Sequence, residues 1–262
     1  MRAESRKLRS ESCFEMRVLA LDTTTRAGST ALVEDDRIVA ERRGDGALTH
    51  ALRMPGEMVA LAAASQWPLS TIDLYAVASG PGSFTGLRIG IATIQGLASV
   101  HRRRVVSVPA LEALAHAGSP DLPEGAVIGA WMDAHRGDVF AALYRVTAAR
   151  PFSRARVVEL EAATVGSPAA TLMRWRAPTA GSAMVVVGDG AVLFAADIVR
   201  ESPSSRIVPP PELAGVIGLL AVDREADALE PAAVRPLYVR RPDVEVVRDE
   251  KLRRTDVKSG DT

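Results

Sequence analysis

The sequence contains little cysteine, little histidine and no excess of charge, and each shortage excludes a class of protein. Its single cysteine, Cys13, can form neither an internal disulfide nor a cysteine-based metal site. None of the four histidines has a second histidine three or four residues away, so the helix-face metal pair is missing and we expect no metal site. With 32 basic and 32 acidic residues the net charge is zero, which argues against strong nucleic-acid binding by this chain alone.

The sequence also lacks a long apolar run. No window approaches the roughly 20 apolar residues of a membrane span, and the first fifteen residues are charged throughout, unlike a signal peptide. We therefore expect a cytoplasmic protein. Residues 1–15 are expected to be a disordered extension, with a short ordered arm as the alternative, and residues 242–262 a charged disordered tail.

The remaining chain alternates short apolar runs with amphipathic segments. This pattern predicts an α/β protein with strands at 17–21, 29–33, 37–41, 74–78, 105–108, 126–132, 138–146 and 185–187, and helices at 51–64, 84–100, 110–117, 191–199 and 212–222. Residues 147–183 give no clear prediction.

Two helices carry specific expectations. In the first, Leu52, Met58, Val59, Ala62 and Ala63 are available to one apolar face, and Pro55 either kinks the helix or makes it begin near Met54. In the helix from residue 84, an apolar stripe follows helical spacing: Leu87, Ile91, Ile94 and Ala98.

Turn-forming residues at 118–125 divide the chain into a first lobe, 16–118, and a second, smaller lobe, 119–241. Each lobe opens with an apolar strand, an aspartate, a glycine-bearing turn and a second strand, at 19–30 and at 128–140. This repetition predicts an internally duplicated, two-lobed α/β protein.

The glycine-rich segment GPGSFTGLRIG, residues 80–90, joins a predicted strand to a predicted helix. Ser83 or Thr85 can cap the helix, and free amides at its start would form an anion site. The spacing is neither a Walker A loop nor GxGxxG. The alternative, which we favour, is a turn whose small residues allow close packing within the chain or against a partner.

Acidic and hydroxyl side chains after the strands are candidates for phosphate or nucleotide binding. A carboxylate beside hydroxyls on a tight turn can hold a hydrated cation near a phosphate, although turn capping explains Asp22 equally well. The candidate set is Asp22, Thr23, Thr24, Gly82, Asp133 and Gly188. Asp133 and Asp138 flank a predicted hairpin turn, for which an ion pair with Arg136 is the favoured interpretation over catalysis.

Several segments, taken in order, resemble the TsaB family. They are LALDTTT (19–25), GPGSFTGLRIG (80–90), IQGLA (94–98), SVPAL (107–111), MDAHRGDVF (132–140), VVGDG (186–190) and PLYVR (236–240). Residues 147–183 match the family poorly. The resemblance implies a two-lobed actin-like ATPase (ASKHA, RNase H-like) fold.

The resemblance further implies a non-catalytic subunit that pairs with TsaD, the paralogous catalytic subunit, and works with the ATPase TsaE. That complex transfers a threonylcarbamoyl group to the adenosine adjacent to the anticodon of certain tRNAs. No catalytic residue and no cofactor are expected in this chain, while ATP and a metal belong to the partner subunits. His50 is followed four residues later by Met54, so the histidine pair of the TsaD metal site is missing.

In the family, pairing uses first-lobe helices, which implies an interface on residues 51–64 and 84–98, with the Gly86 and Gly90 side allowing close helix approach. The expected partner-binding residues are His50, Ser83, Phe84, Thr85, Gly86, Arg88, Gly90 and Ile94. Arg102–Arg104 could contact tRNA through the complex, although a solvated helix end is the favoured interpretation.

Two alternatives stay open. The first is an independent actin-like enzyme, either a nucleotide-dependent kinase or a peptidase-like hydrolase. The second is a homodimer that uses the same helix face.

Overall fold

A computed structural model describes residues 15–180 and 183–240. The expected disordered segments, 1–15 and 242–262, lie outside these ranges except for Glu15. The first sheet comprises β1 (Arg17–Asp22), β2 (Ser29–Glu34), β3 (Arg37–Arg43), β4 (Leu74–Gly80) and β5 (Arg104–Pro109), in the order β3-β2-β1-β4-β5. The second comprises β6 (Val127–Asp133), β7 (Val139–Val146), β8 (Val157–Gly166), β9 (Val185–Val187) and β10 (Arg206–Val208), in the order β10-β9-β6-β7-β8.

The two sheets have the same topology. In each, the first strand pairs antiparallel with the second and parallel with the fourth, as the registers Leu19↔Leu32 and Leu19↔Tyr75, and Ala130↔Ala142 and Ala130↔Val187, illustrate. The third strand is antiparallel to the second and the fifth parallel to the fourth. This repeated arrangement confirms the two-lobed actin-like α/β fold.

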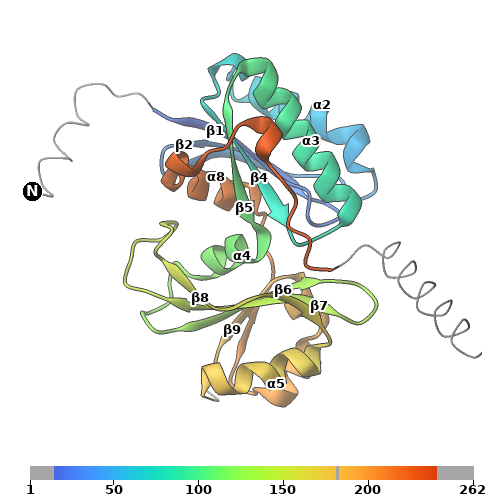
Figure 1. Ribbon diagram of the computed structural model, residues 1–262, viewed down its shortest axis with the longest axis vertical. Helices are drawn as coiled ribbons and strands as arrows, with labels where there is room; N and C mark the ends of the chain where they lie inside the picture. Colours follow the sequence, from blue (N-terminus) through green and yellow to red (C-terminus); the bar gives the residue numbers. More distant parts are fainter. Residues whose placement is uncertain (1–14, 181–182, 241–262) are drawn as a thin grey trace, which may run out of the picture.

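Helices cover both faces of each sheet (Figure 1). On the first sheet, α2 (His50–Ala64) and α3 (Phe84–His101) form the outer layer, while α5 (Pro168–Thr179), α6 (Asp189–Leu193) and α7 (Ala195–Glu201) pack on the second. Between the sheets lie α4 (Ala110–Gly118) and α8 (Ala214–Asp223). Short 3-10 turns occur at Leu69–Thr71, Glu225–Asp227 and Pro231–Ala233.

Strand β1 is buried on both faces, and its sequence is therefore an apolar run without polar residues from Val18 to Leu21. Leu19 and Leu21 pack on one side with Met54 and Ile91, whereas Val18 and Ala20 belong to the inner core shared with α4 and α8. Because α8 contacts β1, β2 and β4, the second part of the chain completes the core of the first sheet. The range 119–241 therefore contains elements that pack on both sheets.

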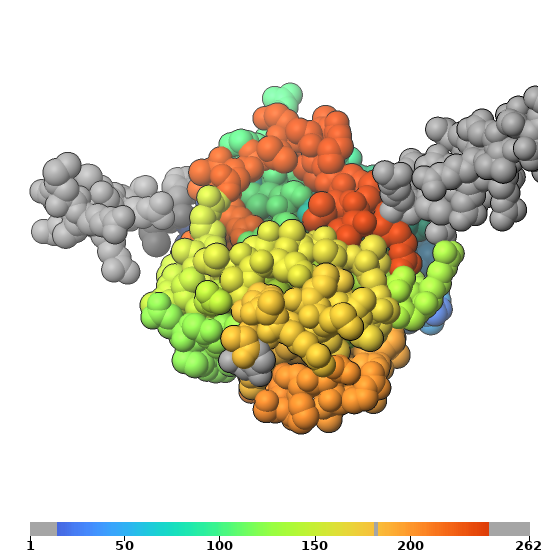
Figure 2. All heavy atoms as spheres, turned by 60° about the horizontal axis from the view of Figure 1, so that its bottom comes forward, coloured from blue at the N-terminus to red at the C-terminus, as the bar shows by residue number. Residues whose placement is uncertain are grey.

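The C-terminal segment crosses from one lobe to the other. Leu237 N donates to Ser79 O at 2.7 Å, and Arg240 Nη1 donates to Ala134 O at 2.7 Å. In Figure 2 the orange-red part of the chain lies over the first lobe and meets the yellow surface of the second. Within the described residues, no helix is long and apolar enough to span a membrane.

Candidate functional site

The glycine-rich segment 80–90 joins the end of β4 to the start of α3. Ser83 Oγ accepts a hydrogen bond from Gly86 N at 3.2 Å, which confirms the predicted capping role of Ser83. Ser83 N donates to Thr24 O at 2.9 Å. A Cβ at Gly82 would lie 2.6 Å from the same oxygen and 2.7 Å from Thr24 Cα. The loop therefore packs on the turn after β1, and the amides of Ser83 and Gly86 are hydrogen-bonded within the chain.

Gly86 and Gly90 face the interior. A Cβ at Gly90 would overlap the side chain of Thr23, and one at Gly86 would overlap Thr23 O and lie 3.3 Å from His50 Cδ2. Ile94 is fully buried on the same helix. The expectation that the Gly86 and Gly90 side of α3 is free for close approach by a partner helix is wrong, because the chain's own turn occupies that space. The predicted stripe from Leu87 to Ala98 is buried, as expected.

The start of α3 is the exposed part of the predicted interface set. Ser83, Phe84, Thr85 and Arg88 are all exposed. The Phe84 ring stacks on Tyr238 with 4.9 Å between centroids, and Arg88 Nε donates to Tyr238 Oη at 3.0 Å. The C-terminal segment thus covers part of this surface.

A cavity of about 220 Å³ lies between the lobes. It is lined by Asp22, Thr25, Arg26, Ala27, Gly28, Ser29, Arg43, Leu114, Met132, Asp189, Pro210, Pro211, Glu212 and Leu213. Pockets that bind small molecules and cofactors usually measure roughly 300–1,000 Å³. The cavity is smaller than that range.

Three carboxyl side chains line this cavity: Asp22 from β1, Asp189 from the start of α6, and Glu212. Burial raises the pKa of Asp22, although its Oδ1 accepts hydrogen bonds from Thr24 N at 2.9 Å and Thr24 Oγ1 at 2.6 Å. Burial also raises the pKa of Asp189. None of these carboxyls belongs to a group of three metal-ligating side chains, since residues 15–180 and 183–240 contain no such group.

The other candidates for phosphate binding do not meet in the cavity. Thr23 is buried beneath α3, and a Cβ at Gly188 would overlap the Trp131 carbonyl. Asp133 N donates to Asp189 Oδ1 at 3.1 Å, and Asp133 Oδ1 caps His135 N at 2.8 Å. Asp133 is thus the last residue of β6, and its carboxylate caps the turn that follows. In the repeated topology the position of Asp22, at the end of the first strand, corresponds to that of Asp133. The sequence pointed to the VVGDG turn but did not single out Asp189, which lies two residues after β9.

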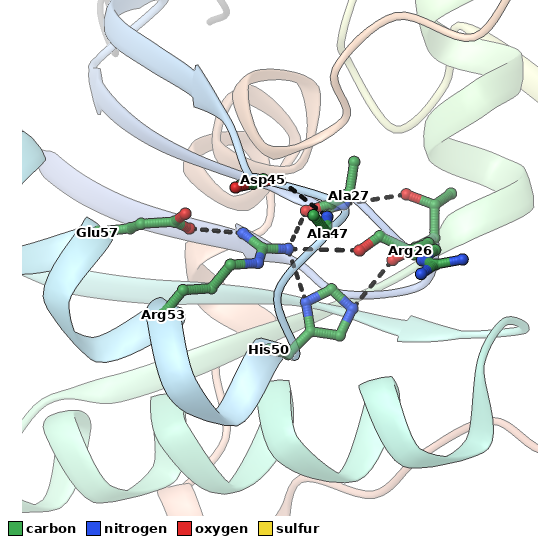
Figure 3. A network of polar contacts seen from close by, with 9 residues as sticks. Arg26, Ala27, Asp45, Ala47, His50, Arg53 and Glu57 are labelled. Carbon is green, nitrogen blue, oxygen red and sulfur yellow. Dashed lines mark hydrogen bonds and ion pairs between the residues drawn. The ribbon is translucent and has the colours of Figure 1, made fainter.

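A buried polar network ties α2 to the turn after β1 (Figure 3). Arg53 is 6% exposed, and its guanidinium donates to Glu57 Oε2 at 2.6 Å, to Arg26 O at 3.4 Å and to Ala27 O. His50 lies within the same network, with Nε2 3.0 Å from Thr25 O and Nδ1 2.9 Å from Arg53 Nη2. The sequence predicted that His50 contacts a partner subunit, and it gave no signal for Arg53.

The comparisons with known proteins agree with the resemblance. A family model described as TsaD, tRNA N6-adenosine threonylcarbamoyltransferase, matches residues 45–162. An uncharacterised protein of Mycobacterium tuberculosis is 30% identical over 230 residues, which cover 86% of this chain and 92% of that protein. The tRNA threonylcarbamoyladenosine biosynthesis protein TsaB of Escherichia coli is 35% identical over 130 residues, 50% of this chain and 55% of that protein.

Solved structures from Pseudomonas aeruginosa match over most of the chain. One, described as an uncharacterised protein with similarity to peptidase YEAZ, has a TM-score of 0.69 and 25% identity, covering 86% of this chain and 100% of that one. YeaZ itself has a TM-score of 0.67 and 24% identity, covering 85% and 99%. Sequence and fold lead to the same conclusion: the chain belongs to the TsaB/YeaZ family.

Proposed function

We propose that this chain is a non-catalytic subunit required for threonylcarbamoyl transfer to the adenosine adjacent to the anticodon of tRNA. It acts by docking α2 and α3 on a TsaD-type catalytic subunit and ordering that subunit. TsaE and tRNA join through the complex, and ATP and a metal are held by the partner subunits. The proposal rests on family membership together with one surface of the first lobe.

That surface is the outer face of α2. Across this helix, every residue of which is described, no exposed position carries a charged or hydrogen-bonding side chain. The exposed residues are Ala51, Leu52, Pro55, Gly56, Val59, Ala60, Ala63 and Ala64. Leu52 is 77% and Val59 52% exposed, whereas Met58, which the sequence assigned to the same broad apolar face, is buried. Pro55 lies inside the helix, which begins at His50 and not near Met54.

The neighbouring helix extends this surface. On α3, Ala92, Gly96 and Val100 form an exposed apolar row at four-residue spacing, and Val100 is 77% exposed; the exposed polar residues of this helix are Thr85, Arg88 and Ser99. A solvated helix normally turns a polar face outward, so an apolar outer layer favours burial against another protein. Full burial of Leu52 and of Val59 would contribute about 1.5–3 kcal/mol each. Residues 45–162, which include α2 and α3, match a TsaD family model, and this relationship favours a TsaD-type protein over an unrelated partner.

The test is co-purification of this chain with TsaD from the same organism. Leu52→Glu and Val59→Glu should each raise the Kd about 100-fold or more, because a buried carboxylate would lack a partner. Met173→Glu is the matched control, since Met173 is 70% exposed on α5 of the second lobe. The variants should melt like the wild type because surface substitutions change stability by only about 0.5 kcal/mol.

The outcomes separate the functions. Loss of the complex in both first-lobe variants, with retention in Met173→Glu, supports the docking surface. Reconstituted threonylcarbamoyl transfer should fall with the complex. A wild-type chain that forms only a homodimer, or forms no complex with TsaD, would overturn the proposal and favour an independent protein.

A further inference from the structure

The network of His50 and Arg53 connects two regions that would otherwise be separate. Leu52 lies on the outer, apolar face of α2, and the next residue, Arg53, points inward. On its other side lies the turn between β1 and β2. Thr25, Arg26 and Ala27 of that turn are part of the wall of the interlobe cavity. The surface proposed for docking and the cavity wall thus lie on opposite sides of the first turn of α2.

The contacts are specific to three consecutive carbonyl groups. His50 Nε2 lies 3.0 Å from Thr25 O, while Arg53 Nη2 reaches both Arg26 O and Ala27 O. A carbonyl oxygen only accepts, so His50 Nε2 carries the proton and Nδ1 accepts from Arg53 Nη2. This tautomer satisfies both ring nitrogens and fixes the ring between the helix and the turn.

The surrounding glycines leave room for these two side chains. A Cβ at Gly28 would lie 3.2 Å from His50 Cε1, and one at Gly86 would lie 3.3 Å from His50 Cδ2. A Cβ at Gly44 would overlap the Arg53 guanidinium and Ala27 O. Three separate segments of the chain are therefore shaped around the same pair.

We propose that His50 and Arg53 form a joint that transmits docking at the outer face of α2 to the turn at residues 23–28, and so positions one wall of the interlobe cavity. The inference rests on the proposed function for its docking partner. Both side chains are positioning residues, since they act through the backbone carbonyls that they hold. The joint is charge-assisted at Arg53, whose Nη1 pairs with Glu57 at 2.6 Å, and this pair orients the guanidinium.

Hydrogen exchange of peptides covering 19–30 and 48–60 tests the joint. In the free chain, Arg53→Met should raise exchange at both the turn and the start of α2 by about tenfold, the effect of losing a hydrogen bond from a charged donor. Arg156→Met is the matched control. Arg156 is also 6% exposed and donates to backbone carbonyls, among them Thr147 O and Leu122 O, but it lies away from the joint. Its loss should leave residues 19–30 unchanged.

The second arm uses the complex with TsaD. In the wild type, docking should protect both α2 and the turn, whereas in Arg53→Met only α2 should gain protection. Gly44→Ala would displace the Arg53 guanidinium from the opposite side and should give the same exchange pattern as Arg53→Met. It replaces Arg53→Met in the experiment if that variant does not fold. Protection of the turn by TsaD in Arg53→Met or Gly44→Ala to the wild-type extent would overturn the joint while leaving docking intact.

Failure of docking gives a different pattern. If TsaD protects neither peptide in the wild type, the proposed function fails. Hydrogen exchange of the free Arg53→Met chain then still tests whether Arg53 links α2 to the turn at residues 23–28. Unchanged exchange at residues 23–28 in free Arg53→Met would refute the joint whatever the partner does.

Discussion

Replacing Gly90 by alanine would test whether the glycines of the segment 80–90 serve internal packing. The new methyl group would overlap the side chain of Thr23, which is fully buried and lies directly beneath α3. Adding a carbon to a tightly packed site costs about 1–3 kcal/mol, and a direct overlap with a fully buried side chain belongs to the upper half of that range, about 2–3 kcal/mol. Alanine recovers about 1 kcal/mol of helix propensity, so we expect a net loss of about 1–2 kcal/mol.

Gly96 on the same helix is the control. It is exposed, and a Cβ there would meet no atom within 4 Å. Gly96→Ala should therefore gain about 1 kcal/mol from helix propensity alone. The two variants should differ by about 2–3 kcal/mol, which corresponds to about 5–10 °C in Tm for a protein of this size.

Thermal unfolding followed by circular dichroism measures the difference, and binding to TsaD is recorded for the same samples. A Gly90→Ala protein that melts at or above the wild-type temperature would refute the packing argument. If that variant also lost the complex, the glycine side of α3 would be a partner surface after all.

Three further predictions follow from buried groups. Burial lowers the pKa of His116 to about 4, so the stability that its neutral form contributes above pH 6.5 is lost as the pH falls through 4. Over this range the free energy of unfolding in urea should fall by about 3 kcal/mol more for the wild type than for His116→Leu. Burial and the charge of Arg53 also lower the pKa of His50, so acidification below 6.5 should loosen the turn at 23–28, and His50→Gln should abolish that pH dependence in hydrogen exchange. Residues 16–118 alone should show no cooperative thermal transition because α8 is missing, and a cooperative transition would contradict the shared core.

The sequence predicted most strands because buried strands in this fold carry no polar interruption. The run at 18–21 is apolar on both faces, since helices cover both sides of the sheet. The strand β8 and helix α5 were not predicted. In β8 most residues are partly or fully exposed, and α5 mixes apolar and charged residues without a clear stripe.

Long-range contacts account for what the sequence missed at the site. The four-residue spacing of Gly86 and Gly90 correctly indicated a close approach, but the approaching group, Thr23, lies about sixty residues earlier in the chain. Leu52 and Val59 look like core residues because apolarity alone cannot tell a core from an interface. Arg53 carries no local signal, since its importance comes from carbonyl groups that only the folded turn brings together.

The duplicated topology provides an internal comparison for the docking surface. The helices α2 and α5 occupy equivalent positions, each between the third and fourth strands of its sheet. On α5 the exposed side includes Arg174 and Arg176, which pair with Glu161 and Glu201. The same position in the fold thus accepts a charged, solvated surface, so the fold itself does not require an apolar outer face on α2. Exposed apolar area of this kind is unfavourable in water unless another surface covers it. The contrast between the two helices therefore favours a docking partner specific to the first lobe.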